Sequence, residues 1–86
     1  MAFRRSFTRD LKKIRDESLL RRVKEAIQQV EAAETLRELP NLTKLSGASG
    51  FYRIRIGDYR IGIAVENDEV EFVRCLHRRD IYRHFP

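Results

Sequence analysis

The clearest pattern of hydrophobic and polar positions runs from Phe51 to Ile63. Apolar and polar residues alternate on both sides of Gly57 and Asp58, which is typical of two antiparallel strands joined by a two-residue turn. The register that this turn predicts opposes Ile56 with Tyr59, Arg55 with Arg60, Ile54 with Ile61, Arg53 with Gly62 and Tyr52 with Ile63. The alternation places all the arginines of the hairpin on one face and its isoleucines on the other.

Arg53, Arg55 and Arg60 form a cluster of like charges on the polar face. Directly opposed like charges destabilise an antiparallel pair by about 0.2 to 1 kcal/mol, so the cluster indicates an anionic partner. Guanidinium groups are planar, always charged and able to donate two parallel hydrogen bonds to phosphate. We therefore predict a phosphodiester site here, the alternative being the ordinary solvated face of a half-buried sheet. Gly62 favours the site, because it is expected to leave open space beside Arg53.

The N-terminal part of the chain predicts a brief strand followed by a helical hairpin. Residues 2–7 are expected to contain a short strand that enters a first helix, capped by Ser6 or Thr8. A break is expected near residues 16–18, and a second helix then continues to about Glu34. The apolar residues of this second helix recur at helical spacing, at Leu19, Leu20, Val23, Ile27 and Val30. We interpret most of the charged residues of both helices, a set that includes Asp10, as solvated faces.

A connector, another strand and a short helix complete the predicted fold. Residues 35–50 are rich in glycine, serine, proline and asparagine and are expected to form a connector without regular structure. Residues 69–76 predict a strand, and the spacing of Ile81 and Phe85 predicts a short helix held against the sheet. Residues 1–86 are therefore expected to form one α+β domain. In it, the N-terminal strand and helical hairpin pack on one face of a small antiparallel sheet.

Composition indicates the kind of partner and the cellular compartment to expect. The 86 residues carry a net charge of +5 at pH 7, which favours an acidic partner, either nucleic acid or protein. A single cysteine, Cys75, cannot form an internal disulfide, which is typical of a reducing compartment. No stretch approaches the roughly 18 apolar residues of a membrane span, and the N-terminus lacks the apolar run of a signal peptide. We expect a cytoplasmic protein without membrane association.

If the phosphodiester is RNA, few residues suit the proton transfers at the 2′-oxygen and the 5′-oxygen that its cleavage requires. The arginines could stabilise the charge that develops when a 2′-hydroxyl attacks its neighbouring phosphate, but no matched acid and base are evident. His77 and His84 are interpreted as structural or surface residues, and Cys75 as a small core residue. Tyr82 could stack on a base or anchor packing. Carboxylates and histidines lack the spacing of a metal site, so no metal or other cofactor is expected.

Three segments carry a family resemblance: Lys44-Leu45-Ser46-Gly47, the stretch from Tyr52 to Arg60, and the stretch from His77 to Tyr82. They resemble the RelE/ParE superfamily of toxins from bacterial and archaeal toxin-antitoxin pairs, closer to its RelE-like mRNA interferase branch. The resemblance spans nearly the whole chain. It implies a RelE-like fold, ribosome-dependent cleavage of mRNA in the ribosomal A site, and a cognate antitoxin that wraps a monomeric toxin within a hetero-oligomeric complex.

The resemblance also implies site residues. The basic positions of the family fall on Arg53, Arg55 and Arg60 in the sheet and on Arg78 near the C-terminus, with Arg79 as a rival, and its tyrosine falls on Tyr82. Some RelE-type enzymes have lysines where Arg53 and Arg55 stand. Arginine is a poor general base, so the resemblance accounts better for phosphate binding than for proton transfer. Two alternatives stay open: a ParE-like poison of DNA gyrase, and a catalytically weak homologue that binds only its antitoxin.

Overall fold

The computed structural model describes residues 1–45 and 49–86. Within them, the predicted strand after the hairpin and the predicted C-terminal helix are both present. The elements follow in the order β1 (Ala2–Phe3), α1 (Arg5–Lys12), α2 (Glu17–Ala32), η1 (Leu36–Glu38), β2 (Leu42–Lys44), β3 (Phe51–Ile56), β4 (Tyr59–Glu66), β5 (Glu69–His77) and α3 (Arg78–His84).

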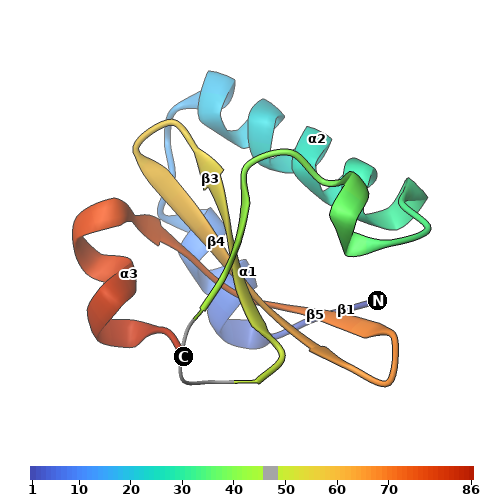
Figure 1. The fold of residues 1–86 in the computed structure, drawn as a ribbon. Helices are drawn as coiled ribbons and strands as arrows, with labels where there is room; N and C mark the ends of the chain where they lie inside the picture. Colours follow the sequence, from blue (N-terminus) through green and yellow to red (C-terminus); the bar gives the residue numbers. More distant parts are fainter. Residues whose placement is uncertain (46–48) are drawn as a thin grey trace.

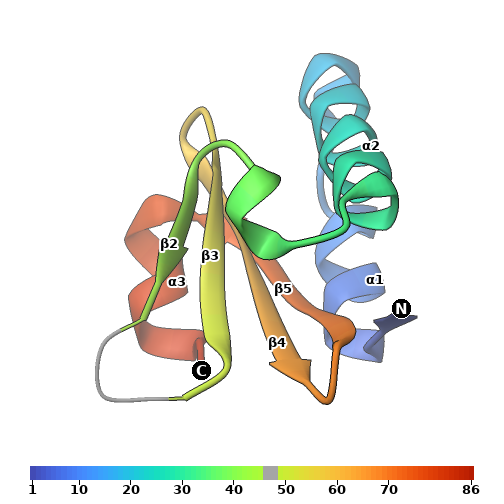
Figure 2. The same ribbon diagram turned by 45° about the vertical axis from the view of Figure 1, so that its right-hand side comes forward.

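A five-stranded sheet in the order β1-β5-β4-β3-β2 lies between two layers of helices. β1 runs parallel to β5, and the other neighbouring strands are antiparallel. Figures 1 and 2 show α1 and α2 on one face of the sheet and α3 on the opposite face. The predicted α+β class is confirmed, and the first two helices pack on one face of a small sheet as expected. The N-terminal strand does not pack on that face, because β1 is an edge strand of the sheet itself.

The β3–β4 hairpin has the register that the alternation predicts. All five expected pairs are present, from Ile56 opposite Tyr59 to Tyr52 opposite Ile63. Gly57 begins the turn with a φ of 57°, a left-handed value that glycine adopts without steric strain. The isoleucines of the hairpin are buried in one core with α1 and α2, and they are Ile54, Ile56, Ile61 and Ile63.

A β-bulge in β5 changes which of its side chains enter that core. Arg74 and Phe72 pair with adjacent residues of β4, so Val73 between them is the extra residue. Phe72 and Cys75 are three positions apart and would face opposite sides of a regular strand. Because of the bulge, both are buried in the core with α1 and α2, whereas Val73 packs with α3.

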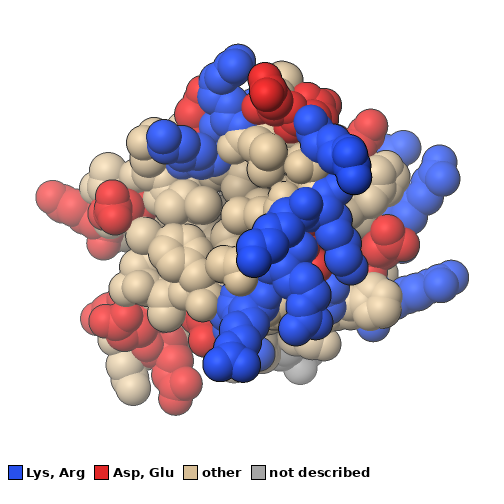
Figure 3. All heavy atoms as spheres, turned by 180° about the vertical axis from the view of Figure 1, so that it is seen from behind, with Lys and Arg blue, Asp and Glu red and all other residues tan. Residues whose placement is uncertain are grey.

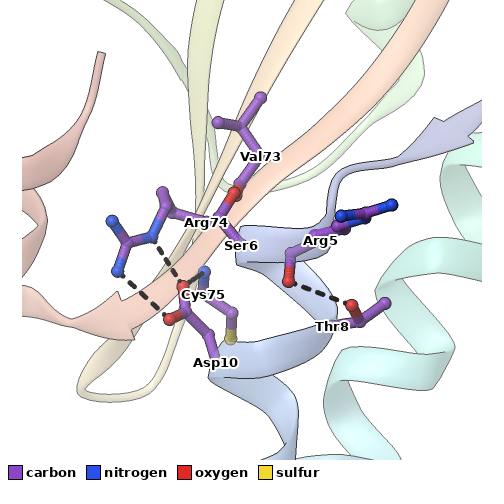
Figure 4. Close-up of polar contacts among 7 residues, drawn as sticks. All are labelled: Arg5, Ser6, Thr8, Asp10, Val73, Arg74 and Cys75. Carbon is purple, nitrogen blue, oxygen red and sulfur yellow. Dashed lines mark hydrogen bonds and ion pairs between the residues drawn. The ribbon is translucent and has the colours of Figure 1, made fainter.

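The predicted cap of the first helix is wrong. α1 begins at Arg5, and its N-cap residue, Arg4, makes no side-chain capping hydrogen bond. Ser6 instead donates to the carbonyl oxygen of Val73 at 2.6 Å, and Thr8 donates to that of Arg5 at 3.0 Å (Figure 4). The physical reason is the short β1 strand: the backbone N–H of Arg4 still bonds to β5, and the chain turns into the helix immediately afterwards.

The second helix agrees more closely with the prediction. α2 begins at Glu17, within the predicted break, and ends at Ala32, slightly before the predicted end at Glu34. Asp16 is its N-cap, and the carboxylate accepts hydrogen bonds from the backbone N–H groups of Ser18 and Leu19 at 2.9 and 3.2 Å. These bonds satisfy two of the donors that the first turn of a helix leaves free.

The predicted connector contains two elements, so this part of the prediction is wrong. η1 is a single 3-10 turn, and β2 is an edge strand that pairs with β3. Three residues are too few for hydrophobic alternation to be visible in the sequence, and β2 exists because β3 offers it hydrogen bonds. Residues 46–48, which belong to the predicted connector and in part to one family-like segment, lie outside the described residues.

Asp10 joins α1 to β5, so the interpretation of the helix charges as a solvated face is wrong at this residue. It is only 4% exposed, and its carboxylate accepts hydrogen bonds from Arg74 at 2.8 and 3.1 Å and from the backbone N–H of Cys75 at 2.9 Å (Figure 4). The hydrogen-bonded carboxylate raises the pKa of Arg74. Burial, reinforced by the negative charge of Asp10, raises the pKa of the Cys75 thiol to about 12. Cys75 is therefore protonated at neutral pH, and its predicted place in the core is confirmed.

The expectation that Gly62 leaves open space beside Arg53 is wrong. A Cβ atom at Gly62 would lie 2.7 Å from ring atoms of Phe85, so this ring already fills the space. Phe85 and Ile81 are buried and hold α3 on this face, together with Phe51, whose ring meets that of Phe85 edge-on. The predicted anchoring of the helix by Ile81 and Phe85 is confirmed, and the glycine permits its close approach.

Candidate functional site

A hollow of about 410 Å³ opens on the arginine face, where α3 meets β2, β3 and β4. In Figure 2, β2, β3 and α3 lie together on the side of the molecule away from α2. The lining contains the predicted sheet arginines and the predicted tyrosine, and consists of Asn41, Leu42, Thr43, Arg53, Arg55, Arg60 and Tyr82. The fold thus brings together four of the five residues predicted for the site.

Uncharged groups hold Arg55 and Arg60. Nη2 of Arg55 donates to Oδ1 of Asn41 at 3.2 Å, and Nη1 of Arg60 donates to the carbonyl oxygens of Gly57 and Tyr59 at 2.8 and 2.9 Å. Within residues 1–45 and 49–86, neither arginine forms an ion pair with a carboxylate. Their guanidinium groups are therefore held in place while their charge stays available to an anion.

Arg53 is held by the ring of Tyr82. Its guanidinium carbon lies 4.6 Å from the ring centroid, which is a cation–π contact. Nε of Arg53 is buried and has no hydrogen-bond partner among the described residues. Tyr82 is 70% exposed, so it contributes little to the core and presents an aromatic surface on which a nucleic-acid base could stack.

Arg78, the fifth predicted residue, is not part of the lining of the hollow. It is the first residue of α3, and its Nε lies 4.0 Å from the carboxylate of Asp58 in the β3–β4 turn. Both side chains are well exposed, so this pair contributes only about 0 to 1 kcal/mol. The rival residue Arg79 is also exposed. Its backbone N–H donates to Nδ1 of His77 at 3.1 Å, which gives His77 the structural role that we predicted.

The site can supply positive charge and an aromatic ring. Among the residues that the structure describes, its lining includes no histidine and no carboxylate. Elsewhere in the described chain, no three His, Cys, Asp or Glu side chains are grouped in a way that could hold a metal ion. The chemistry available in the hollow is therefore electrostatic stabilisation of an anion and stacking on a planar group.

In the part of the chain that the structure describes, no helix has the length and apolar character needed to cross a membrane.

Charge is unevenly distributed over the surface. Figure 3 shows the molecule from behind, with lysine and arginine side chains gathered over α1 and acidic side chains gathered over the β4–β5 turn. Arg5, Arg9 and Lys12 are exposed on α1, and the first turn of this helix contains no acidic residue. A polyanion would be attracted to this side of the molecule, away from the β4–β5 turn.

Asn41 and Thr43 are lining residues that the sequence did not identify. They lie beside and within β2, which falls in the segment predicted to be a connector. Asn41 has a φ of 61°, a left-handed conformation that asparagine adopts more readily than most residues. The sequence signal was the Pro40-Asn41 pair, which indicates a turn but not the strand that follows it.

Comparisons with known proteins identify similar proteins that are described as toxins. The sequence model of one family, described as "ParE toxin of type II toxin-antitoxin system, parDE", matches residues 1–82. A protein named Toxin RelE3 from Methanocaldococcus jannaschii is 39% identical over 85 residues. The aligned region covers 98% of this chain and 96% of that protein.

Two solved structures extend the comparison to the fold. A chain of the RelB-RelE antitoxin-toxin complex from Methanococcus jannaschii has a TM-score of 0.84 and 36% identity, with full coverage of both chains. A chain of the archaeal RelE-RelB complex from Pyrococcus horikoshii has a TM-score of 0.71 and 23% identity, covering 90% of this chain and 91% of that one. The first similarity extends to sequence and fold, and the second shows the fold.

Proposed function

Since the chain belongs to the ParE toxin family of type II toxin-antitoxin systems, within the RelE/ParE superfamily, and is a RelE-like toxin, we propose that it cleaves mRNA. The proposed substrate is mRNA in the ribosomal A site, and the proposed outcome is inhibition of translation in the cytoplasm. The observation that carries the proposal is the hollow in which Arg53, Arg55, Arg60 and Tyr82 meet.

In the proposed reaction, the 2′-oxygen of one nucleotide attacks the adjacent phosphorus. A bond forms between phosphorus and the 2′-oxygen while the bond to the departing 5′-oxygen breaks. The 2′-hydroxyl loses a proton and the 5′-oxygen gains one. Negative charge builds up on the non-bridging phosphate oxygens, and Arg55 and Arg60 would stabilise it. Because the described part of the lining offers no imidazole or carboxylate, we assign the arginines to phosphate binding and charge stabilisation rather than to proton transfer.

The exposed residues of α3 have separate proposed roles. Tyr82 would stack on a base beside the scissile phosphate, in an orientation supported by its contact with Arg53. Arg78 would approach the leaving side of the phosphate. Its pair with Asp58 is long and exposed, so exchanging this carboxylate for a phosphate oxygen requires little energy.

A cognate antitoxin is the proposed partner. A basic surface of this kind would be neutralised by an acidic or amphipathic segment that folds on contact and covers the arginines or displaces the C-terminal segment. Binding should be tight and should weaken as salt increases, because exposed charges are screened. Isothermal titration of the toxin with its purified antitoxin at several salt concentrations tests this, and an affinity independent of salt would contradict the electrostatic part of the proposal.

Primer extension on an mRNA in translating ribosomes tests the proposed activity. Wild type should produce cuts within codons, Arg60→Ala should reduce them about 100-fold or more, and Tyr82→Phe should retain most of them. Arg21→Ala is a matched control, because Arg21 is an exposed arginine on α2, which covers the other face of the sheet. Absence of cuts with the wild type, in a reaction that a known RelE-type toxin cleaves, would overturn the proposal.

A ParE-like poison of DNA gyrase is the second candidate, because the matching family model describes ParE toxins. A gyrase supercoiling assay distinguishes the two functions: inhibition of gyrase without cleavage of mRNA would favour this second candidate. A catalytically weak homologue would show neither activity and would still bind antitoxin. The absence of carboxylate partners for Arg53, Arg55 and Arg60 among the described residues argues against such a relic.

A further inference from the structure

Asn41 makes two contacts with Arg55. Its main-chain carbonyl accepts the backbone N–H of Arg55 at 3.0 Å, and its side-chain oxygen accepts Nη2 of the same arginine at 3.2 Å. The first contact lies directly beside β2, and the second reaches into the hollow that both residues line. One asparagine thus fixes both the backbone and the guanidinium group of Arg55.

The backbone of Asn41 makes the second contact possible. Asn41 has a φ of 61° in the turn just before β2, and its amide oxygen meets Arg55 on the arginine face. Arg55 is exposed, and an exposed arginine samples many rotamers that it must give up on binding. A hydrogen bond formed before binding reduces this loss.

The chemical nature of the contact matters as much as its position. An amide oxygen accepts a hydrogen bond from a guanidinium group without cancelling its charge, whereas a carboxylate would form an ion pair. The other two arginines also have uncharged partners: carbonyl oxygens for Arg60 and an aromatic ring for Arg53. The three arginines therefore share uncharged partners, although the chain contains 13 acidic residues.

We propose that Asn41 is a positioning residue, which holds Arg55 toward a bound phosphodiester while leaving the charge of Arg55 uncompensated. This inference rests on the proposed phosphodiester site and adds to it the group that sets the charge and orientation of one of its arginines. It assigns Asn41 no contact with the reacting atoms. It also explains why an amide rather than a carboxylate stands at this position.

Two substitutions separate charge from structure. Asn41→Asp keeps the size of the side chain and its acceptor oxygen but adds a negative charge beside Arg55. Asn41→Gly removes the acceptor and adds no charge. Aspartate and glycine both tolerate a positive φ, so neither variant strains the backbone. Asn67→Asp and Asn67→Gly are matched controls, because Asn67 has a φ of 51°, is exposed, and lies in the β4–β5 turn outside the hollow.

The first measurement is the single-turnover rate of mRNA cleavage in programmed ribosomes, as a function of toxin concentration. We expect Asn41→Asp to lower the rate at limiting toxin by about tenfold or more, Asn41→Gly to lower it less, and both Asn67 variants to stay within about twofold of wild type. A purely structural role for Asn41 predicts the opposite order, because aspartate keeps the hydrogen bond that glycine loses. That opposite order, or equal rates for Asn41→Asp and Asn67→Asp, would overturn the inference.

The second measurement does not need a ribosome. In ¹⁵N-labelled protein, the side-chain Nε–Hε resonance of Arg55 is followed by NMR while inorganic phosphate is added. We expect the resonance to shift in wild type and both Asn67 variants, and to shift at higher phosphate concentration in Asn41→Asp. Failure of wild type to cleave mRNA, with this pattern intact, would overturn the proposed function but not the role of Asn41. Cleavage by wild type with an unchanged phosphate response in Asn41→Asp would overturn the role of Asn41 alone.

Discussion

The ring of Phe85 packs directly on Gly62, where a Cβ atom would lie 2.7 Å from it. Gly62 is the β4 partner of Arg53, and Arg53 contacts the ring of Tyr82 on α3. The close approach of Phe85 to the sheet therefore sets the position of α3, and with it the position of Tyr82 over the arginines. A glycine that bears no functional group thus helps to shape the candidate site.

Gly62→Ala should damage both stability and the site. The added methyl group must displace the ring of Phe85, and overpacking of this kind costs about 1 to 3 kcal/mol. We expect the free energy of unfolding, measured by urea denaturation, to fall by that amount and mRNA cleavage to fall with it. Phe85→Leu in the same chain should recover part of the loss, because leucine can move aside. Strictly additive effects of the two substitutions would show that the contact is not the cause.

Substitutions of Tyr82 should separate function from stability. Because Tyr82 is 70% exposed and its ring makes a cation–π contact on the surface, Tyr82→Leu should lower the free energy of unfolding by no more than about 1 kcal/mol. The same change should strongly reduce mRNA cleavage, whereas Tyr82→Phe should retain most of it, because the aromatic surface remains. Primer extension and thermal unfolding of the same preparations test both statements. Full activity of Tyr82→Leu would exclude a stacking role.

Asp10→Asn should destabilise the fold. The substitution removes the carboxylate that receives two hydrogen bonds from Arg74 and one from Cys75, and it leaves a partly buried guanidinium without its charge partner. We expect a loss of about 2 kcal/mol or more in urea denaturation. Asp16→Asn is the matched control, because asparagine caps a helix as well as aspartate and should change stability by less than about 0.5 kcal/mol. Equal effects at both positions would refute the importance of the buried pair.

The buried thiol of Cys75 predicts a loss of stability at alkaline pH. Burial raises its pKa from 9.0 to about 12, so at neutral pH the thiol is protonated in both the folded and the unfolded chain. As pH rises from 9 toward 12, only the unfolded chain releases this proton, which favours unfolding by up to about 1.4 kcal/mol per pH unit. Urea denaturation between pH 8 and 10.5 should show a steeper loss for wild type than for Cys75→Ala. Parallel curves would contradict a buried, protonated thiol.

The hairpin and the C-terminal helix could be predicted from the sequence because local rules specify them. A two-residue turn sets the pairing of its flanking strands, and a period of two assigns each side chain to a face. The same turn register and strand period predicted that Arg53, Arg55 and Arg60 lie together on one face. Ile81 and Phe85, four residues apart, were sufficient to indicate an anchored helix.

The features that the sequence did not reveal depend on contacts with other elements rather than on a local pattern. β2 forms because β3 offers it hydrogen bonds, and its three residues carry no pattern of their own. The bulge at Val73 places Phe72 and Cys75 in one core, against the simple alternation of a strand. The open space expected at Gly62 is occupied by Phe85, a residue distant in sequence.

By itself, the sequence determined the α+β class, the register of the β3–β4 hairpin and the gathering of three arginines on one face, because turn geometry and strand period act between near neighbours. Only the tertiary structure decided which groups hold those arginines. Asn41 reaches Arg55 through β2, and Tyr82 reaches Arg53 through α3 packed on Gly62. Such contacts form when separate elements meet, so they depend on the packing of the whole chain rather than on any local pattern.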